Sequence, residues 1–133
     1  MPARILIIED NPANLELVRY LLDAHGYPTV TATNGEEGLR LFGSERPDVV
    51  LCDLQLPILD GYEVLSEIRK DPARGDTIVI AVTAFSMSGD RAKATSAGFD
   101  GYIPKPIDPT TFVQQVEGLL RPDLRALQPP SGS

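Results

Sequence analysis

Five side chains that can do chemistry stand at the ends of strand-like apolar runs in this sequence. They are three carboxylates, a hydroxyl and an ammonium group: Glu9, Asp10, Asp53, Thr83 and Lys105. In open α/β sheets the carboxyl ends of parallel strands meet at one edge, where binding sites form. We therefore expect these five groups to converge at one edge of one sheet, where they could hold a divalent cation and a phosphoryl group.

Each of these residues also has an ordinary structural explanation. An aspartate after a strand, such as Asp53, often only caps a turn, and the segment 9–12 could simply cap the following helix. Thr83 could be a routine strand residue, and Lys105 a solvated loop charge. Their position at the same end of four strands, together with their complementary charges, favours one shared site.

The chemistry that fits this set is phosphoryl transfer to a carboxylate. Asp53 can attack phosphorus and become an acyl phosphate, but both groups are anionic, so catalysis depends on positioning and positive charge. Asp10 and Asp53 offer hard oxygen ligands for Mg²⁺, with Glu9 acting directly or through water. Lys105 adds a mobile positive charge, and Thr83 adds a hydroxyl donor. Without metal, repulsion among the three carboxylates should raise at least one pKa.

The composition restricts the class of protein. The chain has 133 residues, 42% of them hydrophobic, a net charge of −7 and one cysteine. This length suits a single globular domain, and the negative charge argues against direct nucleic-acid binding and against anionic membrane surfaces. A single cysteine excludes an internal disulfide, and no apolar run reaches the length of a membrane span. We expect a cytoplasmic protein without membrane insertion.

Strand-like and helical patterns alternate from residue 4 to about residue 120. Strands are expected near residues 4–8, 30, 49–52, 77–82 and 101–104, and helices near 14–25, 35–44, 62–70, 89–97 and after 109. Near-continuous valine, isoleucine and leucine in the strands indicates an α/β fold, (βα)₅, with a parallel sheet covered by helices on both faces. Asp108-Pro109 should cap and begin the last helix.

The helix expected over 89–97 has a weak apolar face. It can draw on little beyond three alanines, Ala92, Ala94 and Ala97. Because small side chains bury little apolar surface, this helix should be displaced at low cost.

The domain boundary is expected near residue 121. Residues 122–133 lack apolar periodicity and end in Pro-Pro-Ser-Gly-Ser, a composition typical of a frayed or flexible end. We therefore expect one domain over 1–121 and a flexible tail over 122–133.

The order of the motifs resembles that of the receiver domains of bacterial two-component response regulators. The resemblance covers nearly the whole chain and rests on Glu9-Asp10, Asp53 with Leu56-Pro57 and Asp60-Gly61, Thr83-Ala84, Tyr102 and Lys105-Pro106. It implies a flavodoxin-like fold with strand order 2-1-3-4-5. It also implies that Asp53 accepts a phosphoryl group from a phosphohistidine on a histidine kinase or a histidine phosphotransfer protein.

The same resemblance assigns roles to further residues. The implied ligands of Mg²⁺ or Mn²⁺ are Asp10, Asp53, the backbone carbonyl of Gln55 and, directly or through water, Glu9. The residues implied to act on the phosphoryl oxygens are Thr83 and Lys105, and the implied switch residues are Thr83 and Tyr102. The Lys105-Pro106 peptide bond is expected to be cis.

The stretch 83–90 resembles the corresponding loop of single-domain regulators of the DivK kind. By this resemblance the chain promotes its own phosphorylation and dephosphorylation and is not otherwise an enzyme. Phosphorylation would remodel the face formed by the fourth helix, the fifth strand and the fifth helix. A downstream protein partner would bind there.

Three other functions remain open. A phosphatase that forms an aspartyl phosphate would carry a second aspartate two residues after the nucleophile, where this chain has Gln55. A flavodoxin-like nucleotide or flavin binder would need a glycine-rich or hydroxyl-rich phosphate loop after the first strand, where the segment 9–12 is acidic. A pseudo-receiver would bind partners without phosphorylation and would leave the five site residues unused.

Overall fold

Five short strands form one parallel sheet in the computed structural model, which describes residues 2–84, 88–120 and 122–125. In chain order they are β1 (Ile5–Ile8), β2 (Thr29–Ala32), β3 (Val49–Asp53), β4 (Ile78–Thr83) and β5 (Gly101–Pro104). Their order in the sheet is β2-β1-β3-β4-β5, and each neighbouring pair is parallel. The predicted fold class and strand order are therefore confirmed.

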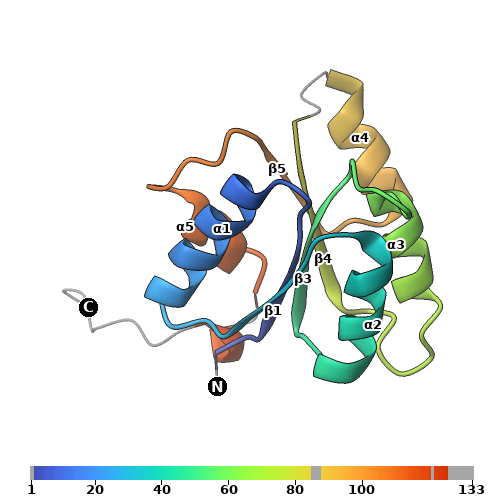
Figure 1. Ribbon diagram of the computed structural model, residues 1–133, viewed down its shortest axis with the longest axis horizontal. Helices are drawn as coiled ribbons and strands as arrows, with labels where there is room; N and C mark the ends of the chain where they lie inside the picture. The colour runs from blue at the N-terminus through green and yellow to red at the C-terminus, as the bar shows by residue number, and fades with distance from the viewer. Residues whose placement is uncertain (1, 85–87, 121, 126–133) are drawn as a thin grey trace.

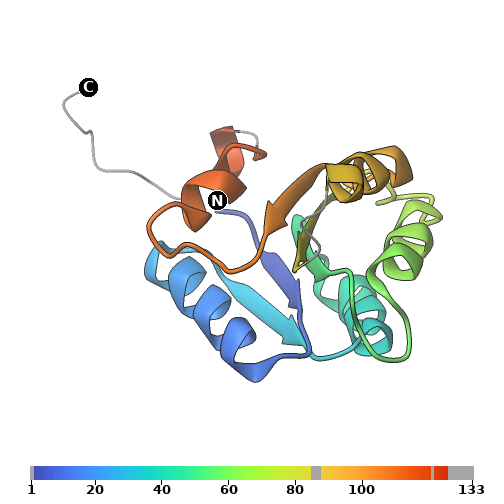
Figure 2. The same cartoon turned by 90° about the horizontal axis from the view of Figure 1, so that it is seen from above.

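Helices cover both faces of this sheet (Figure 1). One face carries α1 (Pro12–Ala24) and α5 (Phe112–Glu117), and the other carries α2 (Gly35–Glu45), α3 (Gly61–Arg69) and α4 (Ser88–Ala97). Figure 2 shows the same two groups from above, with the sheet between them. Each face has its own apolar core, because alternate strand residues point to opposite sides. Within the described residues, no helix is both long enough and apolar enough to cross a membrane.

Side-chain caps fix where α1, α2 and α3 begin. Asn11 and Asn34 each accept a hydrogen bond from the backbone N–H three residues on, at 3.0 and 2.8 Å. Asp60 and Glu63 form a reciprocal capping box at the start of α3. These bonds satisfy N–H groups that have no acceptor within their own helix. They place the first turns of the three helices at the carboxyl edge of the sheet.

Gly61 allows α3 to begin directly against the end of β3. A Cβ atom at this position would lie 2.6 Å from the carbonyl oxygen of Asp53 and 2.8 Å from Cα of Leu54. The N–H of Gly61 also donates to the carbonyl of Leu54 at 3.0 Å. The loop over 54–60 is therefore folded tightly beside Asp53.

Two details of the predicted helices are wrong. The last helix begins at Phe112 and not at Pro109, because the Asp108 carboxylate accepts hydrogen bonds from the N–H and the hydroxyl of Thr110, at 2.9 and 2.7 Å, and so closes a turn. In α4 the expected apolar face is smaller than predicted. Of its three alanines only the middle one, Ala94, is buried.

Residues 122–125 contact the domain, beyond the boundary expected at residue 121. A short 3₁₀ helix (Pro122–Leu124) brings the carbonyl of Leu124 to the N–H of Ala3, which donates to it at 2.7 Å. The Leu124 side chain packs against the core on the α1 and α5 side. The rest of the expected tail, 126–133, lies outside the described residues.

Arg69, at the end of α3, joins two connections on the amino-terminal side of the sheet, the one between α3 and β4 and the one between α4 and β5. Its guanidinium group donates to the carbonyl oxygens of Gly75, Thr77 and Gly98 at 2.8, 2.7 and 2.8 Å. It also forms an ion pair with Asp100 at 2.9 Å. One side chain therefore ties α3 to the segments that lead into β4 and β5.

We expect Arg69→Lys to destabilise the fold by about 2–4 kcal/mol, because an ammonium group cannot reproduce the planar fork that reaches four acceptors. The melting temperature should fall by about 10 °C. Lys70→Ala is the control, since the ion pair of Lys70 with Glu67 is exposed and should contribute less than about 1 kcal/mol. Thermal and urea unfolding measure both variants. Equal losses of stability in Arg69→Lys and Lys70→Ala would show that Arg69 contributes no more than an ordinary surface charge.

Candidate functional site

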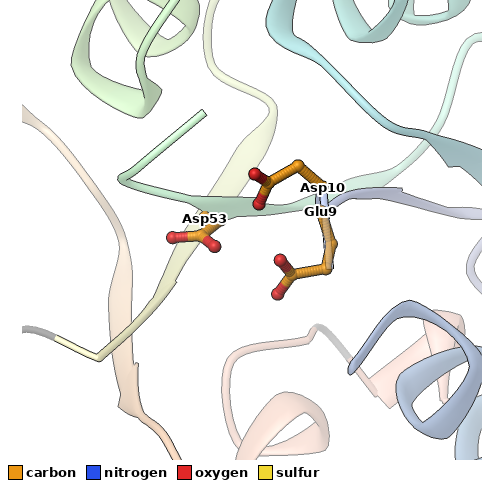
Figure 3. Close-up of side chains that lie close together, drawn as sticks. All are labelled: Glu9, Asp10 and Asp53. Carbon is orange, nitrogen blue, oxygen red and sulfur yellow. The ribbon is translucent and has the colours of Figure 1, made fainter. Parts of the chain in front are cut away.

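The ends of four strands bring the predicted side chains to one edge of the sheet. Glu9 follows β1, Asp53 ends β3, Thr83 ends β4 and Lys105 follows β5. Glu9, Asp53 and Thr83 are 4%, 5% and 0% exposed, whereas Asp10 is exposed to solvent. Figure 3 shows the carboxylates of Glu9, Asp10 and Asp53 gathered at this edge.

The ammonium group of Lys105 lies between the two buried carboxylates. Its Nζ is 2.6 Å from Oε1 of Glu9 and 2.8 Å from Oδ2 of Asp53. Because only 14% of the Lys105 side chain is exposed, these ion pairs are largely shielded from water. The Lys105-Pro106 peptide bond is cis, as predicted. One positive charge thus partly balances two buried negative charges.

The second oxygen of each buried carboxylate accepts a backbone hydrogen bond. Oδ1 of Asp53 accepts from the N–H of Gln55 at 3.0 Å, and Oε2 of Glu9 accepts from the N–H of Asn11 at 3.1 Å. Both carboxylates are therefore held in place through both of their oxygens, and a fixed position favours a reaction at a carboxylate. The predicted metal-binding role of the Gln55 carbonyl stays a prediction.

Burial and the ion pairs act on the pKa values in opposite directions. Burial is the largest influence on Glu9 and raises its pKa; the charge of Asp53 adds to this, whereas hydrogen bonds from Lys105 and the N–H of Asn11 oppose it. Burial lowers the pKa of Lys105, but its hydrogen bonds to Asp53 and Glu9 outweigh burial and leave that pKa raised. A raised carboxyl pKa was expected from repulsion, and desolvation is instead its main cause.

The acidic residues at this edge fit a hard divalent cation. One carboxylate oxygen from each of Glu9, Asp10 and Asp53 lies within 4.8 Å of the other two. Carboxylate oxygens suit Mg²⁺, and the exposed position of Asp10 leaves room for the water molecules that this ion usually keeps. A cation bound here would share Glu9 and Asp53 with Lys105.

Thr83 and Tyr102, the predicted switch residues, lie on the neighbouring strands β4 and β5. The carbonyl of Thr83 accepts the N–H of Lys105 at 2.8 Å, so the ends of these strands are joined beside the acidic groups. Tyr102 is half-buried, pairs in register with Ala81 and packs against the core on the side of α2, α3 and α4. Residues 85–87, which belong to the predicted switch loop, lie outside the described residues.

The loop after Asp53 holds a backbone conformation that sequence patterns do not reveal. Ile58 has a φ of 73°, in the left-handed region that a β-branched residue rarely adopts. The N–H of Leu59 donates to the carbonyl of Pro57 at 2.8 Å and closes a tight turn around Ile58. Pro57 and Gly61 indicate a turn here, but nothing in the sequence indicates that an isoleucine occupies its strained position.

Comparison with known protein sequences agrees with this geometry. Residues 5–117 match the family model described as the response regulator receiver domain. The polar-differentiation response regulator DivK of Brucella anthropi is 41% identical over 120 residues, which are 90% of this chain and 98% of that protein. DivK of Brucella ovis is 38% identical over the same shares of the two chains.

Solved structures share the fold. CheY4 of Vibrio cholerae has a TM-score of 0.85 at 24% identity, over 90% of this chain and 100% of that one, and shows the fold alone. The receiver domain of the sensor histidine kinase PA1611 from Pseudomonas aeruginosa has a TM-score of 0.80 at 32% identity, over 90% and 98% of the two chains, and is described with a magnesium ion coordinated in its active-site cleft. With the fold, the acidic edge and the family match in agreement, the chain belongs to the receiver domain family of two-component response regulators.

Proposed function

We propose that this receiver domain is a phosphorylation switch in which Asp53 accepts the phosphoryl group. The observation that carries the proposal is the setting of the Asp53 carboxylate, which is buried, bonded to Gln55 and Lys105, and grouped with Glu9 and Asp10. The donor is a phosphohistidine on a histidine kinase or on a histidine phosphotransfer protein, the class of partner that a receiver domain implies.

In the transfer, a carboxylate oxygen of Asp53 forms a P–O bond while the P–N bond to the donor histidine breaks, and the electron pair of that bond stays on the histidine nitrogen. The ion pair with Lys105 holds the Asp53 carboxylate in place for this attack. Mg²⁺ or Mn²⁺, held by Asp10, Asp53, the Gln55 carbonyl and, directly or through water, Glu9, would supply positive charge that offsets the repulsion between the two anions.

Lys105 and Thr83 contact the new phosphoryl group in this mechanism. Lys105, held by Glu9 at 2.6 Å, can extend its ion pairs to the phosphoryl oxygens once Asp53 is modified. The Thr83 hydroxyl can donate to another of these oxygens and draw the end of β4 toward the site. Because the Thr83 carbonyl binds the N–H of Lys105, this movement would reach β5 and its Tyr102.

The output surface in this proposal is the face formed by α4, β5 and α5. The ring of Tyr102 turns inward as Thr83 moves, which shifts the population between two packings of one fold. A downstream protein partner binds the shifted face. The domain then acts in the cytoplasm as a single-domain regulator similar to DivK, and it promotes its own phosphorylation and dephosphorylation.

Asp53→Asn should abolish phosphorylation, because the amide keeps the size of the side chain but removes the nucleophile. Asp76→Asn removes the same charge from an exposed position at the opposite edge of the sheet and serves as the control. Each protein is incubated with acetyl phosphate and Mg²⁺ and then weighed by intact mass spectrometry. Wild type and the control should gain one phosphoryl group. A stable gain on Asp53→Asn would refute the assignment of the acceptor.

Mg²⁺ should raise the melting temperature, because it relieves repulsion in the acidic cluster and binds the folded state. At a concentration tenfold above its Kd the stabilisation is about 1.4 kcal/mol, or roughly 5 °C. Asp10→Asn should lose most of this gain, and Asp76→Asn should keep it. If Asp10→Asn responded as the wild type does, the cation would bind elsewhere.

Thr83→Ala should still accept a phosphoryl group but respond weakly to it, since the hydroxyl that links the group to β4 is missing. Thr83→Ser, which keeps the hydroxyl, should respond as the wild type does. NMR shift maps with and without beryllofluoride and Mg²⁺ measure the response of residues 88–104. Equal perturbation of this range in wild type and Thr83→Ala would contradict the role of the hydroxyl.

A further inference from the structure

Apolar burial holds α4 only weakly. Of its described side chains only Ala94 is buried, whereas α3 buries Val64, Leu65 and Ile68. The free energy gained on burial scales with the apolar area removed from water, and an alanine contributes little of it. Other contacts must therefore contribute to the position of α4.

Two cationic side chains of α4 lie over aromatic rings of the neighbouring elements. The guanidinium carbon of Arg91 is 4.9 Å from the centre of the Tyr102 ring on β5, and Nζ of Lys93 is 4.9 Å from the centre of the Tyr62 ring on α3. Both distances are within the about 6 Å at which a cation is attracted to a ring face. In Figure 2 α4, drawn in gold, lies between β5 and α3, so the two contacts hold opposite sides of the helix.

Helix geometry places the two cations on either side of Ala94. Successive residues are rotated by about 100° around the axis, so Arg91 and Lys93 flank the buried alanine. Both rings pack against the core that contains Ala94, and the Tyr62 ring also meets that of Phe99 edge-on, with 5.6 Å between centres. The two rings are therefore held by the core, and the cationic groups of Arg91 and Lys93 lie over them.

The Tyr102 ring connects this arrangement to the acidic site. Tyr102 lies on β5 three residues before Lys105, whose ammonium group binds Glu9 and Asp53. The N–H of Lys105 also binds the carbonyl of Thr83, where β4 ends. A rearrangement at the acidic edge therefore acts on the strand that carries one of the two rings.

We propose that the Arg91–Tyr102 and Lys93–Tyr62 pairs form a cation–π clamp, which holds α4 in its resting position and sets how readily phosphorylation moves it. The influence of the clamp on the response to phosphorylation rests on the proposed function. Displacement of α4, or rotation of the Tyr102 ring, breaks at least one contact, so the clamp opposes the switch. Each exposed contact changes the equilibrium between the resting and the displaced position of α4 about 2- to 5-fold. The clamp therefore shifts this equilibrium toward the resting position without locking it.

The first experiment measures the clamp in the unphosphorylated protein. Arg91→Met and Lys93→Met each remove the charge but keep an unbranched side chain with similar helix propensity. Hydrogen exchange of the α4 amides, followed by mass spectrometry, should be about 2- to 5-fold faster in each variant and faster again in the double variant. Arg40→Met, at an exposed position of α2, removes the same charge and should leave α4 exchange unchanged.

Arg91→Lys separates the charge from the packing of the arginine. A lysine keeps a cation near the Tyr102 ring, so α4 exchange in this variant should stay closer to the wild-type rate than in Arg91→Met. The clamp is overturned if the double methionine variant exchanges at the wild-type rate. It is also overturned if Arg40→Met accelerates α4 equally, or if Arg91→Lys is as fast as Arg91→Met.

The second experiment tests the link between the clamp and the site. Beryllofluoride with Mg²⁺ is the probe, and its apparent affinity falls when most molecules must first rearrange. The double methionine variant should reach half-saturation at a concentration lower by about 2-fold or more. Faster hydrogen exchange of α4 with an unchanged half-saturating concentration of beryllofluoride would overturn the coupling between the clamp and the site. A wild-type protein that did not respond to the probe would contradict the proposed function and the coupling, while the exchange rates would still decide the clamp.

Discussion

The charge balance between Lys105 and the carboxylates of Glu9 and Asp53 is the interaction on which the site depends. Two buried acids lose hydration and repel each other, and one ammonium group at 2.6 and 2.8 Å offsets part of that cost. The sheet makes this possible because β1, β3 and β5 end at the same edge. With Asp10 counted, three acids face one lysine, so the edge is short of positive charge and suited to a divalent cation.

The two ends of α4 are attached in different ways. Its C-terminal end is followed by the buried ring of Phe99 and by Gly98, whose carbonyl accepts a hydrogen bond from Arg69. Its N-terminal half faces the carboxyl edge of the sheet and carries Arg91, which reaches across to the Tyr102 ring. A change at the acidic edge therefore meets the half of α4 that carries Arg91, while the far end lies next to the hydrogen bond between Gly98 and Arg69 of α3.

The fold and the gathering of the reactive side chains at one edge of the sheet could be predicted because their signals are local or depend on topology alone. Asn34 and Asp60 cap helices through hydrogen bonds to residues three positions on, so their roles are visible in a short stretch of sequence. Apolar runs identified the strands, and parallel pairing then required Asp53 and Lys105 to lie at one edge. The start of α5 was missed because the side chain of Asp108 can either close a turn or cap a helix. Sequence patterns do not show which of these two hydrogen-bonding arrangements is preferred.

The amino-acid sequence by itself thus determined the elements, their order and which reactive groups share an edge. Only the tertiary structure decided which groups touch, because those contacts join residues far apart in the chain and depend on register, loop path and rotamer. It decided that Lys105 binds both Glu9 and Asp53, and that Arg69 joins the α3–β4 loop to the α4–β5 loop. It also decided that the cations of α4 close over two rings. Periodicity assigns a long charged side chain to a helix face, but its partner is whatever the packed neighbours place within reach.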